Sequence, residues 1–233
     1  ALGYEFLDNE GKPVGSCAKD LKNVAQIRKD QVRSELTECS FRVACDVTNP
    51  LCGLNGATYI YGPQKGVTDD MREGLDRDLQ HFADVTEMCF GADCASLAGS
   101  GAAGGLGYAF LAYLEADLCP GIDLVMDAVK MDKAMRDADL VFTGEGRLDH
   151  QTAMGKAPAG VARLAKKYGA KVIALAGSVA DGAEACNEAG IDAYFPILRQ
   201  IISLDEAMEP ETARKNMIKT AEQIMRLIKA LQK

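Results

Sequence analysis

The sequence predicts an α/β protein made of two α/β domains, the C-terminal one with a Rossmann-like parallel sheet. From residue 138 onward, short apolar runs alternate with helical patterns over short connections, which is typical of a parallel sheet covered by helices. The composition is that of a folded chain, with 48% hydrophobic and 26% charged residues. At 233 residues the chain is long enough for one large α/β domain or two smaller ones, since domains cluster around roughly 100 to 150 residues. We therefore predict two domains, 1–125 and 126–233.

In the first domain, local patterns predict a series of short elements followed by one long helix. The stretch "ALGYEFLDNEGKPVG" predicts a strand hairpin, residues 18–27 a short amphipathic helix, and "SFRVACDV" a strand. Residues 48–66 hold two prolines and four glycines, so we expect a loop there that encloses a short strand, "ATYIY". A helix capped by Thr68 should follow over 68–89, and a second helix should follow the glycine-rich stretch 99–105.

In the second domain, the pattern repeats strand, loop and helix. Strands are expected at 138–144, 170–178 and 191–197, and helices at 150–169, 182–190 and 209–231, the last with Pro210 in its first turn. In such a parallel sheet, ligands bind at the carboxyl ends of the strands. The segment that follows the first of these strands is therefore the leading candidate for a ligand-binding site.

The charge and the cysteines exclude several classes of function. A formal net charge of −8 without a basic patch argues against nucleic acid and anionic membranes as partners. No apolar run approaches the roughly 20 residues that span a bilayer, and no signal peptide is evident. Eight cysteines without a C-x-x-C pair, beside only two histidines, argue against a zinc site. We expect a reduced, cytoplasmic protein.

The stretch "TGEGRLDHQTAMGK", residues 143–156, is rich in groups that bind phosphate. It fails the P-loop pattern, because Ala157 follows Lys156, and it fails the dinucleotide pattern from Gly144, because position 149 is Asp149. We interpret the strand as ending at Phe142, so that the next residues lie at the edge of the sheet.

In that interpretation, the acidic and the basic side chains of the stretch would bind different groups of a ligand. Glu145 and Asp149 could hold Mg²⁺ or a substrate hydroxyl, and Arg147 and Lys156 could neutralise phosphate oxygens. A tight turn before a capped helix remains an equal alternative.

Two further stretches carry weaker signals. "GSGAAGG" matches G-x-G-x-x-G at residues 99, 101 and 104, but the preceding segment is a poor strand, so either an anion site or close helix packing could explain it. Asp46 and Asn49 follow a predicted strand, where a turn or helix-cap role is the alternative to a catalytic one.

Four stretches in order, "VACDVTNPLCGLNGATYIYGPQKG", "GSGAAGGLG", "LVFTGEGRLDHQTAMGKAPAGVA" and "VIALAGSV", resemble the type I glycerate kinases, a bacterial family. The resemblance runs from the start of the sequence to the final helix. It implies two α/β domains with the active site in the cleft between them. Members of the family carry a further N-terminal region, roughly a third of the whole, that this sequence lacks, so we expect the chain alone to be an incomplete catalyst.

The resemblance implies transfer of the γ-phosphoryl group of Mg-ATP to a hydroxyl of D-glycerate, giving 2-phosphoglycerate or, alternatively, 3-phosphoglycerate. It makes 1–125 part of a substrate-side domain and 126–233 part of the Rossmann-like domain. The implied catalytic residues are Arg147, Asp46 and Lys156; the substrate-binding residues are Asn49, Asp149 and Thr152; and Glu145 would bind Mg²⁺. The residues implied near the nucleotide phosphates are Gly101, Gly104, Gly105, Thr143, Gly144 and Gly146.

Two other classes of function stay open at this point. The chain could be a non-catalytic module that binds a nucleotide or a sugar phosphate. A dinucleotide oxidoreductase is also possible, on the basis of residues 99–104 alone.

Overall fold

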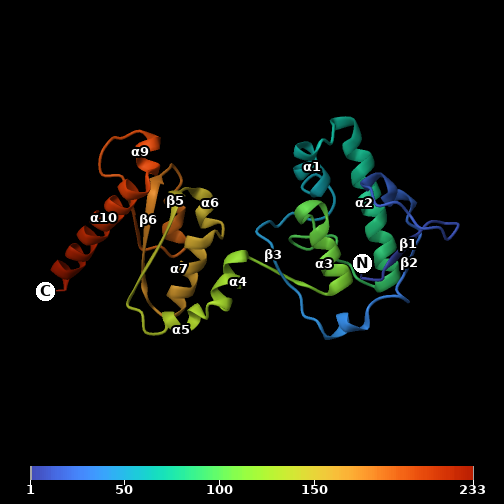
Figure 1. The fold of residues 1–233 in the computed structure, drawn as a ribbon, viewed down its shortest axis with the longest axis horizontal. Helices are drawn as coiled ribbons and strands as arrows, with labels where there is room; N and C mark the ends of the chain where they lie inside the picture. The colour runs from blue at the N-terminus through green and yellow to red at the C-terminus, as the bar shows by residue number, and fades with distance from the viewer. Residues whose placement is uncertain (1, 233) are drawn as a thin grey trace. The chain divides into compact units, whose positions relative to one another are not determined.

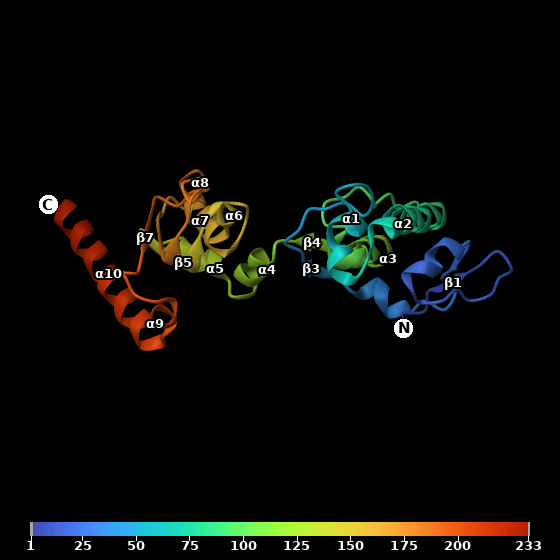
Figure 2. The ribbon, with the colours of Figure 1, turned by 90° about the horizontal axis from the view of Figure 1, so that it is seen from above.

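The computed structural model describes residues 2–232, and the chain separates into two compact units, Ala1–Gly121 and Ile122–Lys233. Figures 1 and 2 show the helices and strands of each unit. The boundary predicted near residue 125 lies within helix α4 (Gly121–Ala128). The α/β class is confirmed, because helices alternate with strands in both units. Within residues 2–232, no helix is long and apolar enough to cross a membrane.

Unit 1 holds two small sheets of two strands each. Strand β1 (Glu5–Leu7) pairs antiparallel with β2 (Gln26–Arg28), and β3 (Arg42–Ala44) pairs parallel with β4 (Asp117–Cys119). The predicted strand at 40–47 is thus confirmed, whereas the expected hairpin is reduced to one bridge between Leu7 and Pro13. The helix predicted over 18–27 is wrong in its second half. A 3-10 helix η1 (Ala18–Asn23) ends there, because pairing with β1 outweighs the local helical pattern.

The helices of unit 1 include one that replaces a predicted strand. Besides η1, this unit contains η2 (Ser34–Glu38), α1 (Ala57–Tyr61), η3 (Pro63–Lys65), α2 (Asp69–Phe90), η4 (Ala102–Gly104) and α3 (Leu106–Leu114). The prediction of a strand for "ATYIY" was wrong, because helical bonds from the Ile60 amide to Gly56 (3.1 Å) and from the Gly62 amide to Thr58 (3.1 Å) satisfy its backbone. So short an apolar run has no period that separates helix from strand. The long helix is confirmed, with Thr68 at its N-cap position.

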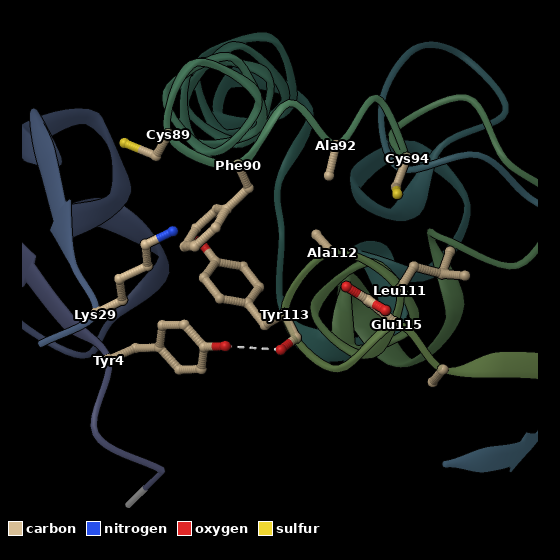
Figure 3. Close-up of a pocket in the computed structure, with 11 residues that line it drawn as sticks. Tyr4, Lys29, Cys89, Phe90, Ala92, Cys94, Leu111, Ala112, Tyr113 and Glu115 are labelled. Carbon is tan, nitrogen blue, oxygen red and sulfur yellow. Dashed lines mark hydrogen bonds between the residues drawn. The ribbon is translucent and has the colours of Figure 1, made fainter. Parts of the chain in front are cut away.

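Aromatic rings fill the region where α2 and α3 end. Tyr113 makes edge contacts with Tyr4 (centroids 5.0 Å apart) and Phe90 (5.2 Å). These rings line a cavity of about 540 Å³ that Lys29 and Glu115 also border (Figure 3). None of the sequence-predicted site residues lines this cavity.

Unit 2 is built on a parallel sheet of three strands in the order β5-β6-β7. These strands are β5 (Leu140–Leu148), β6 (Lys171–Val179) and β7 (Ala193–Pro196). The central strand β6 is buried on both faces: Val172 and Ala174 belong to one apolar cluster, and Ile173 to another. Such two-sided burial explains why β6 is a continuous apolar run. The predicted parallel sheet is confirmed.

Helices α7 (Ala157–Lys167) and α10 (Pro210–Leu231) cover the two faces of this sheet. The other helices of the unit are α4, α5 (Met131–Met135), α6 (His150–Ala153), α8 (Ala185–Glu188) and α9 (Leu204–Met208). Ala162 and Ala165 of α7 pack in one cluster and Ile224 of α10 in the other, and Figure 1 shows α7 and α10 on opposite sides of β6. The last helix begins at Pro210, as predicted.

Two predictions around the phosphate-like motif were wrong. Strand β5 does not end at Phe142 but continues to Leu148, because Arg147 and Leu148 still pair with Ser178 and Val179 of β6. The single helix expected over 150–169 is two helices, α6 and α7. They are separated at Gly155, whose φ of +112° lies in the left-handed region that no helical residue adopts.

Candidate active site

A cluster of charged and polar side chains forms where β5 ends. Glu145 extends from the strand, Asp149 is the N-cap of α6, Thr152 lies within α6, and Lys156 is the N-cap of α7. The four residues come together because the chain leaves β5 at Leu148, makes one short helix, and turns again at Gly155. The cluster lies at the carboxyl end of a parallel strand, where α/β sheets bind their ligands.

The hydroxyl of Thr152 is the centre of this cluster. Thr152 is fully buried, and its hydroxyl donates a hydrogen bond to the Glu145 carboxylate. The same oxygen accepts a bond from the Asp149 amide (3.2 Å), while the Thr152 amide donates to Asp149 Oδ1 (3.2 Å). This reciprocal pair is a capping box, which satisfies free amides at the start of α6. The hydroxyl bond to Glu145 then connects the strand residue to this helix.

Lys156 adds a positive charge to the cluster. Its ammonium lies 3.6 Å from Asp149 Oδ1, and both side chains remain partly exposed. Desolvation opposes ionisation of Asp149, but the charge of Lys156 and hydrogen bonds from the amides of Thr152 and Gln151 lower the pKa of its carboxyl below the usual value. Asp149 is therefore ionised at neutral pH.

A buried cysteine, Cys186, lies close to Glu145 and Asp149. Cys186 is fully buried, and its thiol donates a weak bond to the Asp149 carbonyl oxygen (3.8 Å). Burial raises the pKa of this thiol, and the negative charges of Glu145 and Asp149 raise it further. Cys186 is thus a neutral packing residue next to the cluster rather than a nucleophile.

The other predicted residues of β5 differ in what surrounds them. Thr143 is partly buried within the strand, whereas Arg147 is exposed and forms no ion pair within residues 2–232. A Cβ built on Gly144 would lie 2.1 Å from the Leu175 carbonyl oxygen, so strand packing alone requires this glycine. A Cβ on Gly146 would meet no atom within 4 Å, so its backbone is open to a ligand.

In unit 1, Asp46 and Asn49 make loop contacts of their own. Asp46 accepts a hydrogen bond from the Gly121 amide (2.9 Å), at the first residue of α4, so its carboxylate supports that helix start. The Asn49 amide donates to the Asn55 carbonyl oxygen (2.8 Å) and its oxygen accepts from the Tyr61 hydroxyl (2.6 Å). Both contacts agree with the capping and turn alternatives that the sequence left open.

The predicted glycines near residue 100 occupy positions where a side chain would clash or strain the backbone. A Cβ on Gly101 would lie 2.2 Å from the Pro50 carbonyl oxygen, and Gly104 and Gly105 have positive φ. The element directly before this segment is helix α2 and not a strand, so the strand-turn-helix context of a dinucleotide site is missing. Lys65 lies close to this segment, because a Cβ built on Gly104 would be 3.3 Å from its ammonium, and no local sequence pattern signals this proximity.

The carboxylates of the cluster are compatible with magnesium. Within residues 2–232, no group of three or more His, Cys, Asp or Glu side chains could hold a metal ion alone. Mg²⁺ is usually bound through one or two carboxylates together with phosphate oxygens and water, however. Glu145 and Asp149, joined through Thr152, supply a pair of this kind.

Comparisons with known proteins agree with one another. A sequence model of the glycerate kinase family matches residues 1–229. A glycerate kinase of Bacillus subtilis is 46% identical over 98% of this chain, and a glycerate 2-kinase of Escherichia coli is 44% identical over 89% of it. A crystal structure from Salmonella typhimurium, of a protein assigned as glycerate kinase 2, matches all of this chain with a TM-score of 0.81 at 40% identity.

The matches cover nearly all of this chain but only part of each relative. The chain covers 59% of the Bacillus protein, 54% of the Escherichia protein and 60% of the Salmonella chain. The family model, in contrast, matches nearly all of this chain. From its motifs, its fold and these matches, the chain belongs to the glycerate kinase family.

Proposed function

We propose that the chain forms part of an ATP-dependent kinase that transfers the γ-phosphoryl group of ATP to a hydroxyl of D-glycerate, giving 2-phosphoglycerate. The observation that carries this proposal is the cluster of Glu145, Thr152, Asp149 and Lys156 at the carboxyl end of β5. The name glycerate 2-kinase of the Escherichia relative supports the 2-phosphate as product. Because the chain spans little more than half of its relatives' length, the whole activity remains a proposal.

Phosphoryl transfer asks a protein mainly for positioning and charge neutralisation. In our proposal, Glu145 binds Mg²⁺, and Arg147 and Lys156 neutralise oxygens of the transferred phosphoryl group. Bound Mg²⁺ would supply charge stabilisation between the phosphate oxygens. Asp149 binds substrate beside Lys156. The unpaired state of Arg147 supports its role, since its guanidinium is free for a phosphate or carboxylate.

We assign residues of unit 1 to the substrate and the nucleotide phosphates. Asp46 takes the proton of the glycerate hydroxyl, and Asn49 binds the substrate. The backbone at Gly101, Gly104 and Gly105 lies near nucleotide phosphates, as do Thr143, Gly144 and Gly146 of unit 2. The ammonium of Lys65 beside Gly104 supports an anion at this segment.

We also propose that the protein acts in the cytoplasm. All eight cysteines are free, which supports a reducing compartment.

The test is glycerate-dependent release of ADP from Mg-ATP, measured on this chain and on a protein that carries it at the full length of its relatives. We expect turnover from the full-length protein, with the phosphorus NMR spectrum of the product distinguishing 2-phosphoglycerate from 3-phosphoglycerate. A full-length protein that does not release ADP in the presence of glycerate would overturn the proposed kinase activity. Calorimetric binding of ATP without turnover in either protein would instead favour a nucleotide-binding module.

A further inference from the structure

Thr152 is the least exposed polar residue of the candidate site. Its side chain is fully buried, whereas Glu145 is partly exposed and Lys156 is exposed. A buried hydroxyl has no surface for a ligand. Whatever Thr152 contributes to the site must therefore act through the groups that its hydroxyl contacts.

The direction of each hydrogen bond at this hydroxyl follows from the partners. The Asp149 amide can only donate, so Thr152 Oγ1 accepts from it (3.2 Å). The Glu145 carboxylate can only accept, so it receives the single hydroxyl proton. The alternative acceptor, Asp149 Oδ1, lies 3.5 Å from Oγ1, beyond the usual O–H···O distance. The hydroxyl thus directs its proton to Glu145.

This bond holds one oxygen of Glu145 and leaves the other open. No other hydrogen bond or ion pair of the Glu145 side chain exists among residues 2–232. A carboxylate that is fixed through one oxygen presents its second oxygen in a defined direction. Partners of this kind orient metal-binding carboxylates, and their loss typically lowers metal affinity or activity about 10- to 100-fold.

From these contacts we infer that Thr152 is a positioning residue, which orients the Glu145 carboxylate for the metal ion of the bound nucleotide. The inference rests on the proposed function, because it takes Glu145 as the residue that binds Mg²⁺. It replaces direct contact between Thr152 and substrate, which burial of the side chain does not permit.

Thr152→Val tests the role of the hydroxyl with little change in shape. The valine keeps the backbone amide that donates to Asp149 Oδ1, so it removes only the two bonds of the hydroxyl. Thr152→Ser restores the hydroxyl. Thr86→Val is the matched control, because Thr86 is equally buried and its hydroxyl bonds to Phe82 and Tyr113, none of which belongs to the cluster.

Two measurements are made on each variant in the full-length protein: kcat with KM for glycerate and ATP, and binding of Mn²⁺-ATP followed by water-proton relaxation. We expect Thr152→Val to lower kcat and Mn²⁺-ATP affinity at least tenfold. Thr152→Ser should stay within about threefold of the wild type, and Thr86→Val should leave both values unchanged. The Thr152→Val change should also have little further effect in a Glu145→Gln background, since the two residues act as one unit.

Wild-type kcat and metal affinity in Thr152→Val would overturn the inference. So would equal losses in Thr152→Val and Thr86→Val, or additive losses with Glu145→Gln, because a purely structural hydroxyl would give those results. If the valine variant does not fold, Thr152→Ala takes its place in the same comparison. A protein that binds Mn²⁺-ATP but does not phosphorylate glycerate would refute the proposed function, while the binding series would still decide the role of Thr152.

Discussion

Gly144 of β5 faces the backbone of Leu175 in β6 so closely that a Cβ on the glycine would lie 2.1 Å from the Leu175 carbonyl oxygen. No real Cβ comes so near to a backbone oxygen, and neither strand can shift without disturbing the sheet. Gly144→Ala should therefore lower the free energy of unfolding of unit 2 by about 3 kcal/mol, at the upper end of the usual cost of overpacking. Urea unfolding followed by circular dichroism measures the change.

Gly146 offers the matched control for that substitution. It lies two residues further along the same strand, but a Cβ there would meet no atom within 4 Å, and its φ is not positive. Gly146→Ala should leave the free energy of unfolding within about 0.5 kcal/mol of the wild-type value. Equal losses of stability in both variants would show that the close approach of Leu175 to Gly144 is not the cause of the loss in Gly144→Ala.

Arg147 supplies the second prediction, on activity. Its guanidinium is exposed and unpaired within the described residues, so its removal costs no internal ion pair. If it neutralises the transferred phosphoryl group, Arg147→Ala should lower kcat/KM for glycerate phosphorylation more than tenfold, about 1.4 kcal/mol or more of transition-state stabilisation. Steady-state kinetics on the full-length protein measures this ratio.

The control for Arg147 is a second exposed arginine that does not belong to the cluster. Arg226 is exposed on α10 and pairs with Glu222 (2.9 Å). Arg226→Ala should retain the kinetics of the wild type and lose at most about 0.5 kcal/mol of stability, as surface pairs usually do. Unchanged turnover in Arg147→Ala would remove Arg147 from the site.

The sequence predicted the second unit better than the first for a physical reason. In unit 2, β6 is an apolar run buried on both faces, and its neighbours alternate with helices, so local pattern and tertiary packing agree. In unit 1, the strands have three residues each and exist only through partners far away in the sequence, such as β1 with β2. The run "ATYIY" forms α1, in which bonds within the segment satisfy its backbone.

The candidate site was predictable in residue type but not in arrangement. The sequence drew attention to Glu145, Asp149 and Lys156, which do cluster. It treated Thr152 as a substrate ligand, since burial of a threonine in a four-residue helix has no local signal. The role of Gly144 near nucleotide phosphates stays a prediction, and the close approach of Leu175 is a separate reason for glycine at that position. Both the burial of Thr152 and this close approach arise from contacts between elements, which no single segment encodes.

Cysteine reactivity supplies the third prediction. Cys17, Cys39 and Cys89 are exposed, whereas Cys186 is fully buried, and burial together with two nearby carboxylates raises the pKa of its thiol. Since the thiolate is the reactive form, iodoacetamide at pH 8 should modify the three exposed cysteines within minutes and leave Cys186 intact. Peptide mass spectrometry with and without urea measures the labelling. Native labelling of Cys186 at the rate of Cys17 would contradict its burial beneath the cluster.

Tyr108 supplies the last prediction, on the pH dependence of stability. It is 1% exposed, and desolvation by burial raises the pKa of its phenol from 10.0 to about 12. In the unfolded chain the phenol ionises near its ordinary value. The native state therefore holds this proton more tightly, and stability that is fully present below about pH 10 should be lost as the pH rises towards 12.

One phenol shifted by this amount accounts for about 2 to 3 kcal/mol between those two pH values. Urea unfolding at pH 9, 10 and 11 measures the loss, and absorbance at 295 nm follows the phenolate directly. Tyr108→Phe removes this proton but leaves Tyr113, whose pKa burial also raises, so the difference between the two pH profiles isolates Tyr108. Parallel pH profiles of the two proteins would mean that Tyr108 ionises equally in the folded and unfolded chains, which its burial against Ala83 should prevent.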